Sequence, residues 1–183
     1  MIKTIVADPA WNERGGGKIK RGADRHYRLL STEGNIALMK DWLSEYESYL
    51  NHDLHFYLWV TNNFLRDGFK VIDALGFRYI TNLVWVKPSI GLGQYFRGQH
   101  ELCLFCTRNR GFGVKTEDRT ISSVMKADKR KHSQKPETFY ELVEQRSEGK
   151  YLYFYSRSNQ REGWIMRGDE VGKIEPFKGG ANE

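Results

Sequence analysis

The sequence predicts an α/β fold, in which one mostly parallel sheet carries helices on both faces. Short apolar and aromatic runs alternate with helical patterns along the chain. Its 183 residues suit one domain and leave no room for two. Apolar residues make up 39% and aromatic residues 14% of the sequence, so a sizeable core can form and wholesale disorder is excluded.

The N-terminal part reads as a strand, a long loop and a helix. Residues 3–7 predict a short buried strand, which Asp8-Pro9 ends. Residues 12–30 show neither helical nor strand periodicity, and long loops of this kind tend to be functional. Ser31 can cap the helix that follows. The apolar residues of that helix share one face and are Ile36, Met39, Leu43, Tyr46 and Leu50.

The middle of the chain predicts three strands and one helix. Residues 55–60 are aromatic and β-branched, which is typical of a strand. Residues 63–75 predict a helix that stops at Gly76, because glycine commonly follows a helix end. Residues 77–86 and 101–107 predict two further strands. A glycine-rich loop, residues 89–98, joins them.

The C-terminal part continues the alternation. Residues 121–125 predict a short strand. Residues 136–146 predict a helix with a proline in its first turn, where proline is tolerated. Two aromatic strands follow, at residues 151–155 and 164–166. We expect residues 173–183 to form a loose tail, which leaves residues 1–172 for the domain.

Composition argues against a membrane protein and a disulfide scaffold. No uninterrupted apolar run exceeds five residues, whereas a membrane-spanning helix needs about 20. Two cysteines suit a reducing, cytoplasmic compartment. Cys103 and Cys106 stand in one predicted strand at a spacing that points them to opposite faces. His52 and His55 flank a predicted turn, where a structural role is favoured, so we expect no metal site.

The formal net charge of +6 is concentrated in two segments. Residues 14–28 hold six basic residues and one acid, and residues 126–135 hold five basic residues and one acid. Solvated loop surface is one interpretation. The other is a footprint for the phosphate backbone of a nucleic acid. The phosphate contacts expected in the first segment are Lys18, Lys20, Arg21 and Arg25.

The tetrapeptide Asp8-Pro9-Ala10-Trp11 is the most informative local motif. It follows a predicted strand directly, and ligands of open α/β sheets bind outside the carboxyl ends of the strands. The Asp8 carboxylate and the Pro9 carbonyl could accept the two N–H groups of an exocyclic amine on a nucleobase. The Trp11 ring could stack on that base after it leaves the duplex. An ordinary turn is the alternative.

Further short motifs follow this tetrapeptide in a fixed order. The set comprises Val6-Ala7-Asp8-Pro9-Ala10-Trp11, His26-Tyr27, Leu58-Trp59-Val60-Thr61, Val84-Trp85-Val86-Lys87, Phe96-Arg97-Gly98-Gln99-His100-Glu101, His132-Ser133-Gln134-Lys135-Pro136, Tyr153-Phe154-Tyr155-Ser156-Arg157 and Gly163-Trp164-Ile165-Met166-Arg167-Gly168-Asp169-Glu170. In this order the chain resembles the MT-A70 family of N6-adenosine methyltransferases and its short phage and bacterial members, over about residues 4–172. Ala10 departs from the family's Asp-Pro-Pro-Trp.

The resemblance implies a single Rossmann-like methyltransferase domain that uses S-adenosyl-L-methionine as its cofactor. It implies methyl transfer to the N6 amine of adenine in nucleic acid. Asp8 and Pro9 would then act on N6, Trp11 would stack on the base, and Tyr27 would wall the base pocket.

The resemblance also implies cofactor contacts, residue by residue. Lys135 matches the family lysine that reaches the methionine carboxylate, and Arg157 matches an arginine near the ribose. The remaining expected cofactor contacts are Asp8, Asn159, Gln160, Asp169 and Glu170.

The resemblance favours DNA over RNA as substrate, because the compact chain is similar to phage and bacterial members that modify DNA. Three alternatives stay open: an RNA adenosine methyltransferase, an inactive nucleic-acid-binding partner subunit, and a plain basic nucleic-acid-binding module. Asp8 and Lys135 favour an active enzyme, since inactive relatives lose them. Some members work as dimers, and residues 89–98 are a candidate interface for a homodimer or a related subunit. No membrane partner is expected.

Overall fold

A computed structural model describes residues 1–12, 29–91, 93, 95–110, 114–130, 134–157 and 161–168. Its first half contains β1 (Ile2–Ala7), α1 (Thr32–Glu45), β2 (Leu50–Val60), α2 (Leu65–Ala74) and β3 (Arg78–Val86). Its second half contains β4 (His100–Arg108), β5 (Val124–Lys126), α3 (Glu137–Arg146), β6 (Tyr151–Phe154) and β7 (Trp164–Arg167). Short 3₁₀ turns at Glu47–Tyr49 and Asn62–Phe64 precede β2 and α2.

One seven-stranded sheet organises these elements, in the order β5-β3-β4-β2-β1-β6-β7. Four strand pairs in it are parallel, and β4 is antiparallel to both its neighbours, β2 and β3. The sheet is therefore mixed and mostly parallel, as predicted. Because β4 alone runs backwards, its first residue lies at the edge where the other strands end.

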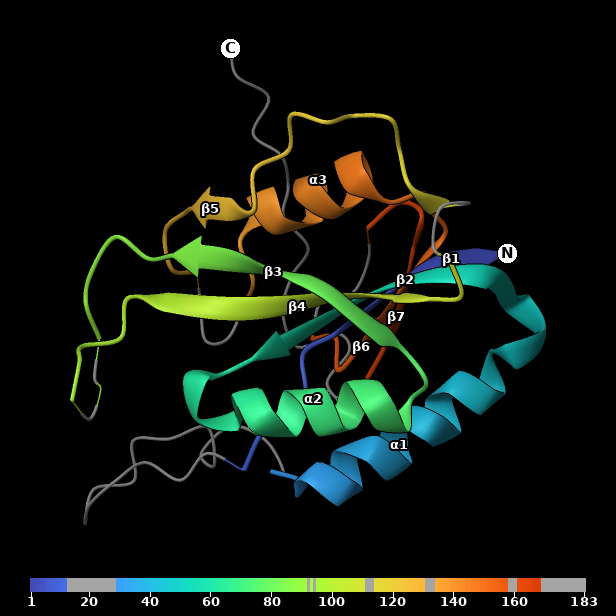
Figure 1. Cartoon of the computed structure of the whole chain (residues 1–183), viewed down its shortest axis with the longest axis horizontal. Helices are drawn as coiled ribbons and strands as arrows, with labels where there is room; N and C mark the ends of the chain where they lie inside the picture. The colour runs from blue at the N-terminus through green and yellow to red at the C-terminus, as the bar shows by residue number, and fades with distance from the viewer. Residues whose placement is uncertain are drawn as a thin grey trace.

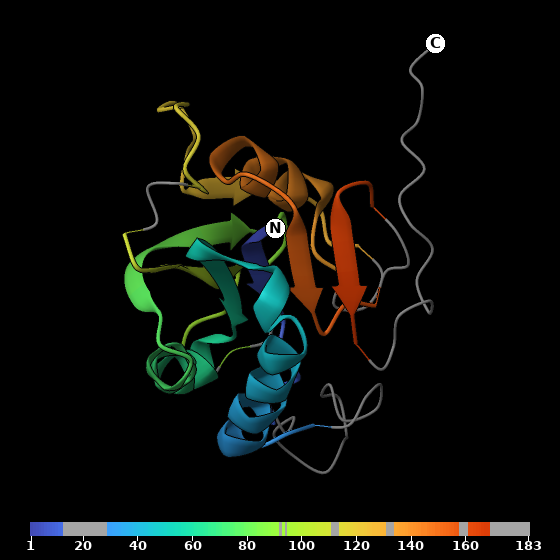
Figure 2. The same ribbon diagram turned by 90° about the vertical axis from the view of Figure 1, so that its right-hand side faces the viewer.

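Helices cover both faces of this sheet (Figures 1 and 2). The core on one face includes Met39 and Trp42 of α1 and Ile72 of α2. The core on the opposite face includes Phe139 and Val143 of α3. The two-sided α/β arrangement expected from the sequence is confirmed, and it is consistent with a Rossmann-like methyltransferase domain. No helix among the described residues is long and apolar enough to cross a membrane.

Local signals placed most element ends correctly. Ser31 caps α1 by accepting a hydrogen bond from the Gly34 N–H, at 3.1 Å. Gly76 follows α2 with a φ of 72°, the left-handed conformation that favours glycine. The prediction for Leu50 is wrong: α1 ends at Glu45, and Leu50 opens β2 because it pairs with Ile2 of β1.

Candidate active site

Charged side chains gather at the carboxyl edge of the sheet. Asp8 directly follows β1, and its N–H donates to the Phe154 carbonyl at the end of β6, over 3.3 Å. Lys87 directly follows β3. Glu101 is the second residue of β4. Because β4 runs in the opposite direction to its neighbours, Glu101 lies at the same edge. Lys135 arrives there from the segment that leads into α3.

Lys135 is the centre of this cluster. Its Nζ lies 3.0 Å from Asp8 Oδ1 and 3.1 Å from Glu101 Oε2. The Nζ also lies 4.7 Å from the centroid of the Trp59 ring, within cation–π range. Only 7% of the Lys135 side chain is exposed. A cation this buried is stabilised by its paired carboxylates. Solvated loop surface, one of the two interpretations of residues 126–135, therefore does not apply to Lys135.

Glu101 is the member of the cluster for which the sequence predicts no role. One of its oxygens contacts Lys135 and the other contacts Lys87. Lys87 Nζ in turn lies 5.0 Å from the centroid of the Trp85 ring. The signal that could have found Glu101 is a carboxylate opening one strand of a hairpin, opposite a lysine that closes the other.

The two carboxylates differ in their electrostatics. Burial raises the pKa of Asp8 and nearby Glu101 adds to the effect, while Lys135 and Arg157 oppose it. Burial also acts to raise the pKa of Glu101, but Lys135 and Lys87 outweigh it and bring this pKa down to about 2. Although burial acts to lower it, the pKa of Lys135 is raised, because Asp8 and Glu101 flank its ammonium group. Glu101 therefore stays ionised more readily than Asp8.

The Asp8-Pro9-Ala10-Trp11 tetrapeptide forms a tight turn. The Pro9 carbonyl accepts a hydrogen bond from the Trp11 N–H, at 2.9 Å. One of its two lone pairs is therefore used, and one is left for another donor. The Ala10 carbonyl accepts from the Leu30 N–H, at 3.2 Å, which ties the turn to the residues before α1.

The structure contradicts the stacking role predicted for Trp11. The Trp11 ring is 5% exposed and stacks on Phe64, with 5.6 Å between ring centroids. Its Nε1–H donates to the Trp59 carbonyl, at 3.0 Å. A ring enclosed in this way offers no free face to a base. Trp11 instead anchors this turn, which contains Asp8, to the part of the core that α1 and α2 cover.

Trp11→Ala should therefore lower the free energy of unfolding by about 3–5 kcal/mol, as for other large core truncations. Trp11→Phe should cost less, about 1–3 kcal/mol, because it keeps a ring but leaves the Trp59 carbonyl without its donor. Urea unfolding measures both, with the exposed Tyr49→Ala as a control within about 0.5 kcal/mol of wild type. Wild-type stability in Trp11→Ala would contradict the anchoring role.

The other predicted site residues divide into described and undescribed positions. Arg157 follows β6, is partly buried, and its positive charge helps to lower the pKa of Asp8. The predicted substrate contacts Lys18, Lys20, Arg21, Arg25 and Tyr27 lie outside the described residues. The same holds for the predicted cofactor contacts Asn159, Gln160, Asp169 and Glu170, and for the tail at residues 173–183. Their roles stay predictions.

Cysteine and histidine take structural positions. Cys103 belongs to the core on the α3 face and Cys106 to the core on the opposite face, as their spacing predicted. His55 is buried, with its Nδ1 2.6 Å from Ser147 Oγ. Within the described ranges, no group of three or more His, Cys, Asp or Glu side chains is arranged to hold a metal ion.

The donor set at this edge fits the polar end of S-adenosylmethionine. Lys135 has three N–H donors, of which Asp8 and Glu101 take two. Thr61 follows β2 on the same face as Trp59. Thr61 Oγ1 and Trp59 Nε1 are buried and find no hydrogen-bond partner within the described structure. Orphaned buried polar atoms are unfavourable unless a ligand or water satisfies them, so a charged, polar ligand suits this edge.

The seven-stranded sheet with helices on both faces is consistent with the class of Rossmann-like methyltransferases. Residues 2–170 match the MT-A70 family, and the chain belongs to this family. It is 24% identical over 181 residues to the "Putative N(6)-adenosine-methyltransferase MT-A70-like" of Medicago truncatula, which covers 93% of this chain and 26% of the relative. It is 23% identical over 180 residues to the "Probable N(6)-adenosine-methyltransferase MT-A70-like" of Oryza sativa subsp. japonica. This alignment covers 93% of this chain and 23% of the relative. The chain spans about a quarter of the length of these curated relatives.

Proposed function

We propose that this chain transfers a methyl group from S-adenosylmethionine to the N6 amine of adenine in nucleic acid, and that the nucleic acid is DNA. The observation that carries the proposal is Asp8 at the carboxyl edge of the sheet, paired with a buried lysine in a chain of the MT-A70 family. When bound, S-adenosylmethionine supplies the methyl group, whose bond to sulfur breaks with its electron pair staying on sulfur.

Asp8 has the central chemical role in this proposal. The N6 lone pair of adenine is delocalised into the ring, which makes N6 a poor nucleophile. Lys135 engages Asp8 Oδ1, and we assign Oδ2 to accept a hydrogen bond from N6. The Pro9 carbonyl can accept from the second N6 proton with its remaining lone pair. Both contacts favour a pyramidal, more nucleophilic nitrogen, whose lone pair forms the new bond to the methyl carbon. They also stabilise the positive charge that develops on N6 until one of its protons leaves to solvent water.

Lys135 has two roles in this arrangement. Its ion pair with Asp8 holds the carboxylate in one position and favours its ionised form. The third N–H of Lys135 is the donor we assign to the methionine carboxylate, with Arg157 contributing positive charge from the loop after β6. Positioning of this kind is a large part of catalysis in a group transfer between two bound reactants.

RNA is the second candidate substrate. Both plant relatives carry "N(6)-adenosine-methyltransferase" in their names, and adenosine names the ribonucleoside. A catalytically inactive partner subunit is less well supported, because Asp8 and Lys135 are both present and in contact.

The test is incorporation of labelled methyl groups from S-adenosylmethionine into matched DNA and RNA oligonucleotides, single-stranded and double-stranded. We expect N6-methyladenine after digestion to nucleosides, with more label in DNA. Oligonucleotides without adenine are the control and should stay unlabelled. Absence of N6-methyladenine from every substrate would refute the methyltransferase proposal, whereas equal or greater labelling of RNA would refute only the preference for DNA.

Glu101→Gln should shift the acidic limb of the pH–rate profile to lower pH. Only the ionised form of Asp8 supplies the negative charge that stabilises the positive charge developing on N6, and Glu101 is one cause of the raised pKa of Asp8. Removing this negative charge lowers the pKa of Asp8, so the ionised form persists at more acidic pH. The measurement is kcat/KM against pH, with the exposed Glu33→Gln as a control. An acidic limb that stays in place or moves upward would contradict the assignment.

A further inference from the structure

The described residues that follow β3 and precede β4 continue the pairing of these two strands as the stem of a hairpin. The Lys87 N–H donates to the Gln99 carbonyl at 2.8 Å, and the Gly91 N–H donates to the Gly98 carbonyl at 2.7 Å. These bonds continue the β3–β4 ladder beyond Val86 and His100. At Gly93 an added Cβ would lie 1.8 Å from the Phe96 carbonyl oxygen, so only glycine permits this close approach. The pairing of the two strands therefore extends to Gly91 and Gly98.

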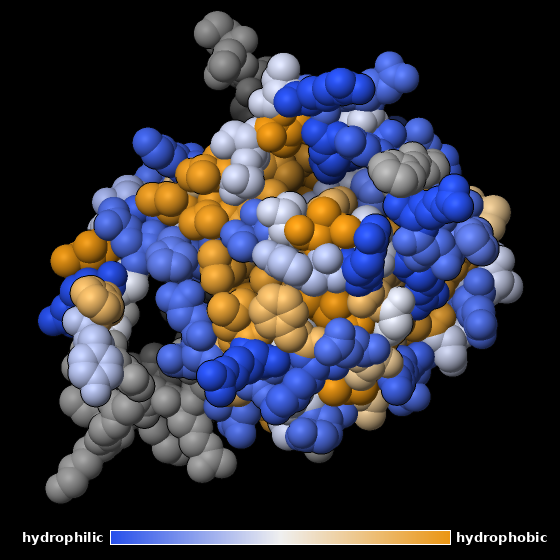
Figure 3. All heavy atoms as spheres, in the orientation of Figure 1, coloured by the Kyte–Doolittle hydropathy of each residue, from blue (hydrophilic) through white to orange (hydrophobic). Residues whose placement is uncertain are grey.

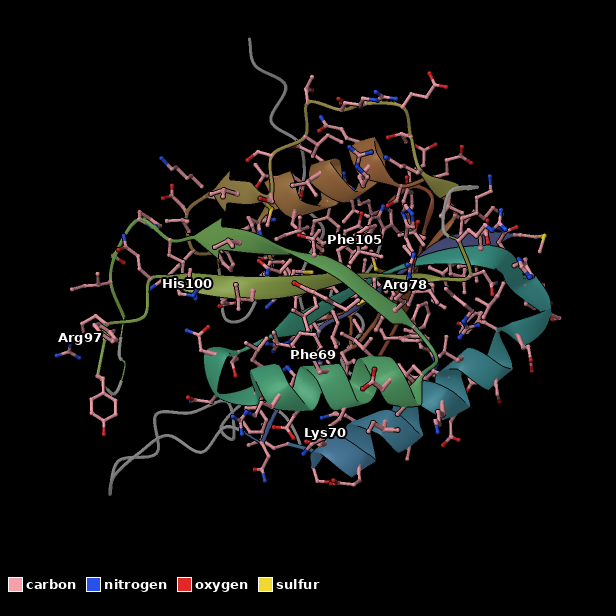
Figure 4. All side chains as sticks on the ribbon, in the orientation of Figure 1. Phe69, Lys70, Arg78, Arg97, His100 and Phe105 are labelled. Carbon is pink, nitrogen blue, oxygen red and sulfur yellow. The ribbon has the colours of Figure 1, made fainter. Side chains whose placement is uncertain are left out.

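The tip presents aromatic side chains to solvent. Tyr95 is 96% exposed and Phe96 is 90% exposed. Arg97 follows them in the sequence and lies at the outer end of the hairpin, and His100 lies at its base (Figure 4). In the space-filling view the hairpin projects at the left, and hydrophobic surface reaches its outer part (Figure 3). Single exposed apolar residues are normal, but two adjacent rings exposed to solvent at the end of a hairpin bury no surface in the core and point to a ligand.

The hairpin rises directly from the candidate active site. Lys87 and Glu101, which flank its stem, belong to the ion-pair chain that ends at Asp8. Basic residues accompany the aromatic tip on this edge. Lys126 at the end of β5 pairs with Val86 in the ladder and is exposed, as is Arg97. Rings flanked by cations next to a site for a nucleobase match the chemistry of a nucleic-acid strand, whose bases stack and whose phosphates are anionic.

We propose that Tyr95 and Phe96 stack on bases that flank the target adenine, with Arg97 against the adjoining phosphates. This inference rests on the proposed function, because it takes nucleic acid as the substrate of the same site. A target base that leaves its strand deprives its neighbours of a stacking partner. An aromatic ring that takes up the exposed base face restores part of that stacking, and it does so for any sequence because every base has a π-face.

The test compares a Tyr95→Ala/Phe96→Ala double variant with the wild type. Binding is measured by fluorescence anisotropy of a labelled adenine-containing DNA oligonucleotide, and stacking by quenching of 2-aminopurine placed beside the adenine. We expect affinity to fall by about five- to one-hundred-fold and quenching to be lost. The variant Tyr95→Trp/Phe96→Trp should retain both. Tyr49→Ala is the matched control, because Tyr49 is 63% exposed just before β2, at the opposite edge of the sheet.

Two further readouts separate this inference from its rivals. Affinity for S-adenosylmethionine, measured by calorimetry, should be unchanged in the double variant. Light scattering should show the same oligomeric state in the variant and the wild type. A variant that loses a dimer but keeps wild-type affinity and quenching would make the hairpin a protein interface and overturn the inference. Unchanged affinity and quenching with normal methyl transfer would overturn the stacking role alone, whereas a wild type without binding or methyl transfer would overturn the proposed function with it.

Discussion

Asp8→Ala should abolish methyl transfer while the fold and cofactor binding are largely kept. The expected loss is about 10²–10³-fold or more in the rate of the chemical step, by analogy with removal of a single donor that stabilises transition-state charge. The fold should survive because Lys135 keeps its ion pair with Glu101 at 3.1 Å. Single-turnover methyl transfer and titration with S-adenosylmethionine measure the two effects separately.

Asp8→Asn is the sharper companion of this variant. It keeps the shape of the side chain and one oxygen acceptor but removes the charge that stabilises a developing positive centre on N6. We expect it to be nearly as inactive as Asp8→Ala. Near wild-type turnover in either variant would show that Asp8 does not act on the amine.

Lys135→Met should have the second largest effect, on stability and on cofactor affinity together. The change leaves the buried Asp8 and Glu101 carboxylates without the cation that they share. Removing one partner from a buried ionic cluster typically costs about 3–5 kcal/mol of folding free energy. Loss of a charge-assisted contact to the methionine carboxylate should weaken cofactor binding by a further 1.5–3 kcal/mol, roughly 10- to 100-fold.

Urea unfolding and calorimetry with S-adenosylmethionine measure these two losses. The double variant Lys135→Met/Glu101→Gln should recover part of the stability, because only one buried carboxylate is then left without a cation. It should recover none of the affinity for S-adenosylmethionine. Unchanged affinity in a folded Lys135→Met protein would remove this lysine from the cofactor site. Unchanged stability would contradict its position at the centre of the ion pairs.

The sequence was sufficient to predict the strand that carries Asp8 and the helix preceded by Lys135. Both predictions depend on short-range signals: an apolar run that stops at Asp-Pro, and a proline that can start a helix. The contact between Asp8 and Lys135 depends on the parallel pairing of β1 with β6. The alternation of strands and helices predicts a parallel sheet but not which strands are neighbours.

Glu101 and Trp11 show where such reasoning stops. A role for Glu101 depends on the reversed direction of β4. Nothing within residues 101–107 shows this direction, which has to be inferred from the short connection at residues 89–98. The burial of Trp11 depends on Phe64 and on the carbonyl of Trp59, both far away in the sequence. Exposed and buried aromatic residues look alike in a sequence, so the sequence alone does not distinguish a ring that stacks on a ligand from one that belongs to the core, as the Trp11 ring does.

The position of β1 between β2 and β6 also sets the order in which a newly made chain can mature. β2 follows β1 after one helix. β6 leaves the ribosome only after β2, β3, β4 and β5 have been made. Until then one hydrogen-bonding edge of β1 stays open, a state that favours association with other chains. Pairings between segments so distant form slowly. Lys135 and the β6 backbone that holds Asp8 both arrive late, so a partly folded chain has no complete candidate site.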